Sequence, residues 1–197
     1  MKIGRLLLRL VVGGLFVGHG VQKLFGWFDG PGLDTTAQGF EHLGLRPGRP
    51  NAIAAGAAEA GGGALLAVGL ETPFAASVLV ATMLTAIHRV HLVKGPWVTN
   101  GGYEYNLVLI AAALALAEVG PGTLSLDAAR GRERSGSGWA LAALATGTIG
   151  ALGSYALAAA QPAPSAPPAG GQNGHAADDQ PASAAQTEQA LDVEAAN

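Results

Sequence analysis

The stretch Gly101-Gly-Tyr-Glu-Tyr-Asn-Leu-Val-Leu-Ile-Ala-Ala-Ala-Leu-Ala-Leu-Ala117 sets an acidic residue between two tyrosines, just before a run of eleven apolar residues. The apolar run predicts a helix in hydrocarbon, and tyrosines are enriched where such helices meet the membrane surface. A carboxylate at the edge of such a helix is costly unless it meets a partner or water. Glu104 is therefore a candidate functional residue.

Composition extends this interpretation to the whole chain. The 197 residues are 49% hydrophobic and 13% charged, with a mean hydropathy of +0.32, whereas soluble domains are about 25% charged. Stretches near the ~20 residues that cross a bilayer lie at 6–24, 52–70, 74–91, 103–118 and 139–160. We predict an all-α polytopic membrane protein, with a four-helix transmembrane bundle and a fifth C-terminal span.

Three regions are expected along the chain. Residues 1–130 form the four-helix bundle, and residues 131–160 form a basic loop and the fifth transmembrane helix. Residues 161–197 change to Ala, Pro, Gln and Gly with five acidic residues and no Lys or Arg. This composition is typical of a disordered tail.

The connections between spans carry recognisable signals. Residues 35–38 have capping-box spacing, which predicts a short helix that reaches about Leu43. The tight link Glu71-Thr-Pro73 predicts that the second and third spans are antiparallel neighbours. Ser125 or Asp127 can cap a brief helical turn after the fourth span.

Basic residues indicate an orientation in the membrane. Two basic clusters fall on the same side if four spans separate them: Lys2, Arg5, Arg9, Arg130, Arg132 and Arg134. The positive-inside rule places both in the cytoplasm, which puts the N-terminus inside and the C-terminal tail outside. The bias is small, because the opposite side carries Lys23, Arg46, Arg49 and Lys94. The first span is expected to be retained, since no small-x-small cleavage site follows it.

Alternating helix directions bring most of the intramembrane polar residues to one end of the bundle. Glu59 lies about nine residues into its span, roughly 12 Å deep at 1.5 Å per residue, where it needs a cation or a proton. We predict that Glu59 meets His88, or the His19 and Lys23 pair, close to Glu104 and beside a lateral apolar slot. The candidate ligand-binding residues are His19, Lys23, Glu59, His88, His91, Tyr103 and Glu104.

Each candidate also has a structural interpretation. Glu59 could form an ion pair that only locks the bundle, the histidines could pack, and Lys23 and Arg89 could extend to lipid headgroups. Tyr105 is typical of an interfacial aromatic belt. His88 and His91, with i,i+3 spacing, leave a zinc or iron site geometrically open. No metal is assigned, because the Glu-x-x-His pair of helical carboxylate sites is missing.

Several function classes are excluded by the residues themselves. The chain has no cysteine, which removes disulfides, iron–sulfur clusters and thiolate chemistry, so a redox role needs a bound cofactor. Phosphate-binding loops, a serine-nucleophile elbow and a basic aromatic surface are missing. No nucleic-acid partner is expected.

The ordered set of motifs resembles the DoxX family of small bacterial inner-membrane proteins over about residues 3–130. The motifs are His19-Gly-Val-Gln-Lys-Leu-Phe-Gly-Trp-Phe-Asp-Gly-Pro-Gly32, Phe40 to Leu45, Glu59 before glycines, Ala86-Ile-His-Arg-Val-His91, Gly101-Gly-Tyr-Glu-Tyr105 and Gly120-Pro-Gly-Thr-Leu-Ser-Leu-Asp-Ala128. The resemblance implies a four-helix membrane bundle, and it says nothing about the fifth span or the tail. The family is named for similarity to the membrane subunit of an archaeal thiosulfate:quinone oxidoreductase, and some members are linked to quinone handling or oxidative stress.

Three functions stay open at this point. The first is a quinone-linked redox or oxidative-stress-associated subunit, which binds quinone without a covalent cofactor and acts with a redox partner protein. The second is a non-catalytic membrane anchor or scaffold, and the third is a small-solute permease, which five short spans without an evident repeat favour least. The sequence is also compatible with a homo-oligomer in the lipid bilayer.

Overall fold

The computed structural model describes residues 2–161, and the predicted acidic tail lies beyond this part of the chain apart from Gln161. Regular structure within residues 2–161 is entirely helical, as the sequence predicts. The elements are α1 (Ile3–Phe25), α2 (Gly32–His42), α3 (Gly48–Val68), α4 (Thr72–Ala86), η1 (Ile87–His91), η2 (Leu92–Lys94), η3 (Val98–Asn100), α5 (Glu104–Val119), α6 (Leu126–Ala129) and α7 (Ser137–Ala159).

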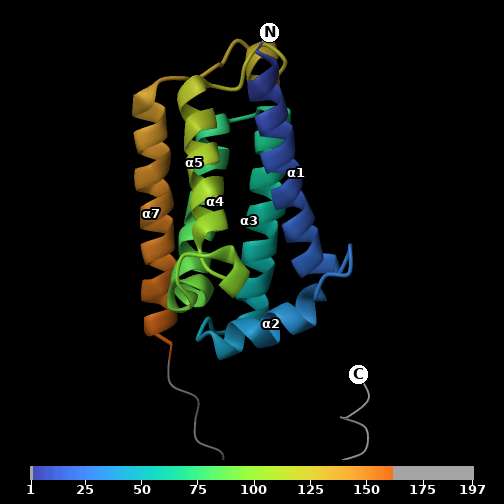
Figure 1. Cartoon of the computed structure of the whole chain (residues 1–197), viewed down its shortest axis with the longest axis vertical. Coiled ribbons are helices and arrows are strands. Elements are labelled where there is room, and N and C mark those ends of the chain that lie inside the picture. Colours follow the sequence, from blue (N-terminus) through green and yellow to red (C-terminus); the bar gives the residue numbers. More distant parts are fainter. Residues whose placement is uncertain (1, 162–197) are drawn as a thin grey trace, which may run out of the picture. The chain divides into compact units, whose positions relative to one another are not determined.

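The long helices run side by side and alternate in direction (Figure 1). α1 packs mainly on α3, and α4 packs against α3, α5 and α7. The short helix α2 lies across one end of the bundle, and the turn α6 lies at the other end with the N-terminus (Figure 1). The predicted antiparallel contact of the second and third spans, α3 and α4, is confirmed.

Within residues 2–161, four helices are long and apolar enough to cross a membrane: Ile3–Phe25, Gly48–Val68, Thr72–Lys94 and Ser137–Ala159. These include the predicted C-terminal span, α7. α5 has 16 residues, about 24 Å of helix against ~30 Å of hydrocarbon. The number of crossings thus depends on α5, and the five-span topology stays a prediction.

The segment before α5 explains why this helix starts part-way along the bundle. The chain turns back after η2, where the Tyr103 amide donates to Gly95 O at 3.2 Å and the Glu104 amide donates to Pro96 O at 2.8 Å. Gly102 is buried, and a Cβ at this position would collide with Gly95 O. Non-helical backbone is tolerated at membrane depth where protein covers it, which fits this compact return.

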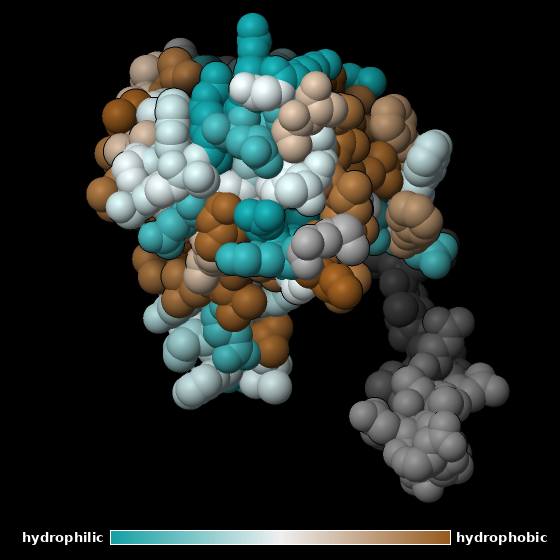
Figure 2. Space-filling model, turned by 90° about the horizontal axis from the view of Figure 1, so that it is seen from above, coloured by the Kyte–Doolittle hydropathy of each residue, from teal (hydrophilic) through white to brown (hydrophobic). Residues whose placement is uncertain are grey.

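The outside of the bundle is suited to lipid. Leu141, Ile149, Leu152 and Leu157 on α7 are each more than half exposed, whereas the bundle interior is filled by Phe16, Leu66, Leu79 and Leu116. Figure 2 looks onto the end that carries the N-terminus, where hydrophilic residues gather between more hydrophobic flanks. Together with the family evidence below, this makes the chain a multi-pass membrane protein in contact with the bilayer.

The predicted caps have different outcomes. α2 begins at Gly32, so Thr35 lies inside the helix and its interpretation as part of a capping box is wrong. Pro31 precedes the helix with a φ of −67°, which is already helical, and Gly32 adopts a positive φ of 71°. The helix therefore starts one turn earlier than the capping signal predicts. Ser125 does cap α6, because its hydroxyl accepts a hydrogen bond from the Ala128 amide at 3.1 Å.

Polar side chains join the helices at the N-terminal end of α1. The guanidinium of Arg9 is buried and donates to Ala67 O at 2.9 Å, to Leu124 O at 2.5 Å and to Pro121 O. Asp127 is buried beside this point and accepts hydrogen bonds from the Glu71 and Thr72 amides, at 3.0 and 3.3 Å. This end is therefore held by hydrogen bonds from side chains to backbone.

Candidate functional site

An ion pair joins α1 to α3 inside the bundle. Lys23 Nζ lies 2.5 Å from Glu59 Oε2, which is one of the two contacts that the sequence predicts for this carboxylate. The Glu59 side chain is 5% exposed and the Lys23 side chain 26% exposed. A buried carboxylate without a cation would be strongly unfavourable, so the pair fixes the relative placement of the two helices.

Small residues bring α1 and α3 together at this level. A Cβ added to Gly20 would lie 2.5 Å from Ala60 N and 2.6 Å from Gly56 O, so only glycine allows this approach. Lys23 follows Gly20 by almost one helical turn and Glu59 precedes Ala60. The close contact of the backbones therefore places the ammonium within reach of the carboxylate.

The ion pair borders a cavity of about 640 Å³. All five long helices line this cavity, together with the chain after α2 and the segment before α5. Its volume lies within the roughly 300–1,000 Å³ of small-molecule sites, and its lining is mostly apolar, as in such sites. The ionisable side chains in the lining are His19, Lys23, Glu59, Arg89, His91 and Tyr105.

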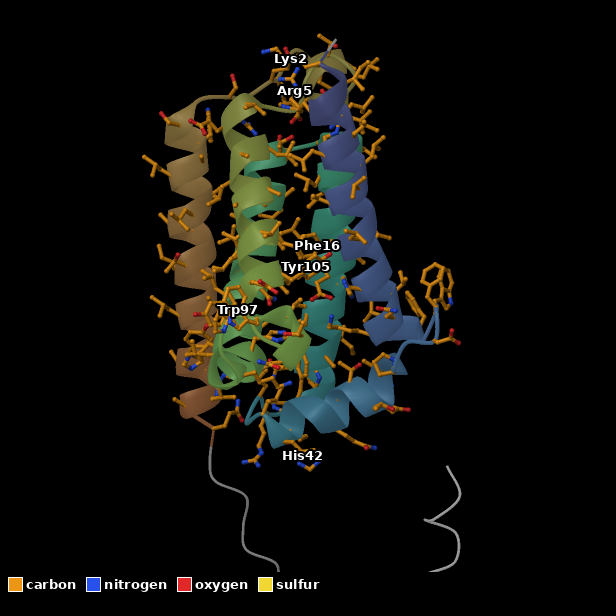
Figure 3. The ribbon with its side chains drawn as sticks, viewed as in Figure 1. Lys2, Arg5, Phe16, His42, Trp97 and Tyr105 are labelled. Atoms are coloured by element: carbon orange, nitrogen blue, oxygen red, sulfur yellow. The ribbon has the colours of Figure 1, made fainter. Side chains whose placement is uncertain are left out.

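Two of these side chains are both in the lining and exposed. His19 on α1 and Tyr105 on α5 line the cavity and are exposed, Tyr105 by 40%. Figure 3 places Tyr105 between the end that carries Lys2 and Arg5 and the end that carries His42. The lining thus includes exposed residues on more than one helix, and the bundle does not enclose the cavity completely.

The histidines after α4 face different surroundings. His91 lines the cavity and its Nδ1 lies 2.6 Å from Gly101 O. His88 is exposed and stacks on Tyr155 of α7, with ring centroids 4.4 Å apart. Residues 87–91 form a π turn, which holds more residues than an α turn. The i,i+3 spacing therefore does not bring His88 and His91 to one face as the sequence predicts.

Three candidates do not line the cavity, namely His88, Tyr103 and Glu104. The predicted contact of Glu59 with His88 is therefore replaced by its contact with Lys23. Glu104 instead binds the loop that precedes it, because its Oε1 accepts a hydrogen bond from the Val98 amide at 2.6 Å. The non-helical backbone before α5 has amide groups that need acceptors, and a carboxylate at the first residue of the helix supplies one.

Residues outside the predicted set take their place. Arg89 lines the cavity and lies over the ring of Tyr155, with Cζ 5.4 Å from the ring centroid. Asn106 is buried in the lining and donates to Met83 Sδ at 3.3 Å. An amide among the apolar residues of α5 is a signal that sequence reasoning could have used.

Metal binding has no visible basis in the described part of the chain. Residues 2–161 contain no group of three or more His, Asp or Glu side chains placed to hold a metal ion. The i,i+3 histidines that left this option open point apart, as described above.

Comparison with known proteins places this arrangement in a family. The DoxX family model matches residues 4–92, which contain Lys23, Glu59, Arg89 and His91. A Bacillus subtilis (strain 168) protein named "Putative oxidoreductase CatD" is 36% identical over 126 residues, or 64% of this chain and 86% of that protein. The chain belongs to the DoxX family. No solved structure shows a significant match to it.

This DoxX chain continues beyond the matched residues, and its last helix contributes to the cavity. α7 supplies Gly150 and Ser154 to the lining and Tyr155 to the contact with Arg89. A Cβ at Gly147 would lie 2.8 Å from Ser77 O, so a small residue lets α7 approach α4. The cavity is thus completed by a helix outside the stretch that the family model matches.

Proposed function

We propose that this DoxX protein is a quinone-linked redox or oxidative-stress-associated subunit of the bacterial inner membrane that acts with a partner protein. The observation that carries the proposal is the mostly apolar cavity of about 640 Å³ that has the Lys23–Glu59 pair in its lining. The name of the Bacillus subtilis relative, "Putative oxidoreductase CatD", supports a redox role.

The chemistry of a quinone suits these residues. A quinone carbonyl accepts hydrogen bonds, so the Lys23 ammonium and the His19 imidazole can hold one end of the ring while the apolar lining takes the rest. Reduction to the quinol takes two electrons and two protons. The Lys23 ammonium can give a proton to a ring oxygen, and the Glu59 carboxylate can take up a proton from water and return it to Lys23, so the pair can deliver the two protons in turn. The partner supplies the two electrons, because the chain has no cysteine with which to hold an iron–sulfur cluster.

Replacing Glu59 with glutamine is expected to weaken quinone binding about 3- to 10-fold while leaving membrane insertion intact. The amide keeps the shape but not the charge that positions Lys23, and one such hydrogen bond contributes about 1 kcal/mol. Titration of the purified protein with decyl-ubiquinone measures the effect. Glu41→Gln is the matched control, because Glu41 pairs with Arg46 outside the cavity. Equal affinities of Glu59→Gln and wild type would remove Glu59 from the binding site.

The scaffold alternative treats the pair as structural, and a double variant separates the two interpretations. Lys23→Met with Glu59→Leu replaces the ion pair by apolar residues of similar size, which often preserves or raises stability. We expect this variant to remain folded and to lose decyl-ubiquinone binding. Unchanged quinone binding by the folded double variant would favour the scaffold.

The orientation of the chain is part of the same proposal. With the N-terminus in the cytoplasm and five crossings, position 135 is cytoplasmic and a fusion near position 170 is exported. Paired reporter fusions at these two positions measure this, and we expect activity of the cytoplasmic reporter only at 135 and of the exported reporter only at 170. The same reporter active at both positions would show that α7 does not cross.

A further inference from the structure

The charges around the cavity do not balance. Glu59 neutralises Lys23, but Arg89 makes no ion pair with any acidic residue in the described part of the chain. Its Nε atom is buried and has no hydrogen-bond partner among residues 2–161. A guanidinium nitrogen in such a position is costly unless something accepts from it.

Arg89 is also held in place. Its guanidinium packs on the ring of Tyr155 at 5.4 Å, and one terminal nitrogen lies 3.5 Å from Leu43 O. Tyr155 is itself fixed, since its hydroxyl donates to Leu84 O at 3.0 Å and its ring stacks on His88. An arginine that only extends to the membrane surface would need no such support.

We propose that Arg89 binds the anionic headgroup of an amphiphile, a carboxylate or a phosphate, whose apolar chain occupies the cavity. A planar guanidinium donates two parallel hydrogen bonds to either group. The lining beyond Arg89 is formed mainly by small and apolar residues such as Ala54, Ala58, Ala81 and Leu109, which suits a hydrocarbon chain. This proposal does not require the ligand to be a quinone, because it depends on Arg89 rather than on the Lys23–Glu59 pair.

The test compares two probes of the same chain length, dodecanoate and dodecanol, with the purified protein depleted of lipid. Wild type is expected to bind dodecanoate at least 10-fold more tightly than dodecanol, and Arg89→Gln to lose this preference, as expected for one charged hydrogen-bonding group. Arg89→Lys keeps the positive charge but lacks the planar pair of guanidinium donors, so its preference for dodecanoate should lie between those of wild type and Arg89→Gln. Lys94→Gln is the control, since Lys94 is an exposed cation near Arg89 in sequence that does not line the cavity.

A second variant separates the cavity from the outer surface. Ala58→Leu places bulk in the lining without changing charge, so it should weaken binding of both probes, and thermal melting checks that it is folded. Equal dodecanoate affinity of wild type and Arg89→Gln, an equal loss in Lys94→Gln, or full dodecanoate binding by folded Ala58→Leu would each overturn the proposal.

Added lipids identify the source of the headgroup. If the natural ligand is a membrane lipid, phosphatidylglycerol should displace dodecanoate from wild type, while phosphatidylcholine should not. If it is a free acid, dodecanoate should bind and neither phospholipid should displace it. The neutral decyl-ubiquinone is titrated into the same variants. Weaker quinone binding with unchanged dodecanoate binding in Glu59→Gln, and the reverse in Arg89→Gln, would separate this inference from the proposed redox function.

Discussion

Arg9→Met is expected to destabilise the bundle by about 3–5 kcal/mol, the cost of removing a buried charged partner from its network. Arg9 is 3% exposed, and its guanidinium donates to three carbonyls, from Ala67, Pro121 and Leu124. These carbonyls belong to α3 and to the connection between α5 and α6. Methionine fills much of the same space but leaves all three acceptors without their donor, at about 1–3 kcal/mol for each unsatisfied group.

Thermal melting in detergent measures this effect. A loss of this size lowers the Tm by roughly 10 °C in a chain of this length. Arg5→Met is the control, because Arg5 lies one turn earlier and donates to Val119 O at 2.8 Å in a more exposed setting. The Tm of Arg5→Met should fall much less. Equal losses in the two variants would mean that burial and the three-carbonyl contact of Arg9 contribute little.

The role of Arg9 shows what the sequence could not provide. Its position among basic residues near the N-terminus predicts a charge facing the cytoplasm, yet the side chain turns inward and joins α3 to the connection between α5 and α6. Helix positions were predictable, because length and hydropathy depend on local sequence alone. The partner of a basic side chain depends on how helices rotate against each other, which local sequence does not specify.

The candidate site was likewise predictable where it depends on helix direction, and not where it depends on helix rotation. Helix direction correctly brings His19, Lys23, Glu59 and His91 around one cavity. Rotation decides the rest: the π turn at residues 87–91 sends His88 to Tyr155, and the loop before α5 uses Glu104. A π turn has no reliable signal in one sequence. The contribution of α7 to the cavity could not be predicted either, since small residues in a helix indicate a close contact but not which helix is the partner.

Alanine substitutions in α1 at the contact with α3 are expected to change the stability of the bundle strongly. The expected change differs between two nearby glycines, Gly20 and Gly18. Gly20→Ala should destabilise the bundle by about 1–3 kcal/mol, because the new methyl group meets backbone atoms of Ala60 and Gly56 at 2.5 and 2.6 Å, and backbone cannot move aside as a side chain can. Gly18→Ala is the matched control, since nothing lies within 4 Å of its added Cβ. Alanine there should be neutral or stabilising by up to about 1 kcal/mol, the gain in helix propensity.

These two variants also test whether packing sets the geometry of the site. Pushing α1 away from α3 at Gly20 lengthens the 2.5 Å contact between Lys23 and Glu59, so Gly20→Ala should bind decyl-ubiquinone more weakly even at temperatures where it is folded. Gly18→Ala should bind as wild type does. Thermal melting and quinone titration on both proteins measure the two effects separately. A Gly20→Ala protein that melts early but binds quinone normally would show that the ligand does not depend on the ion pair.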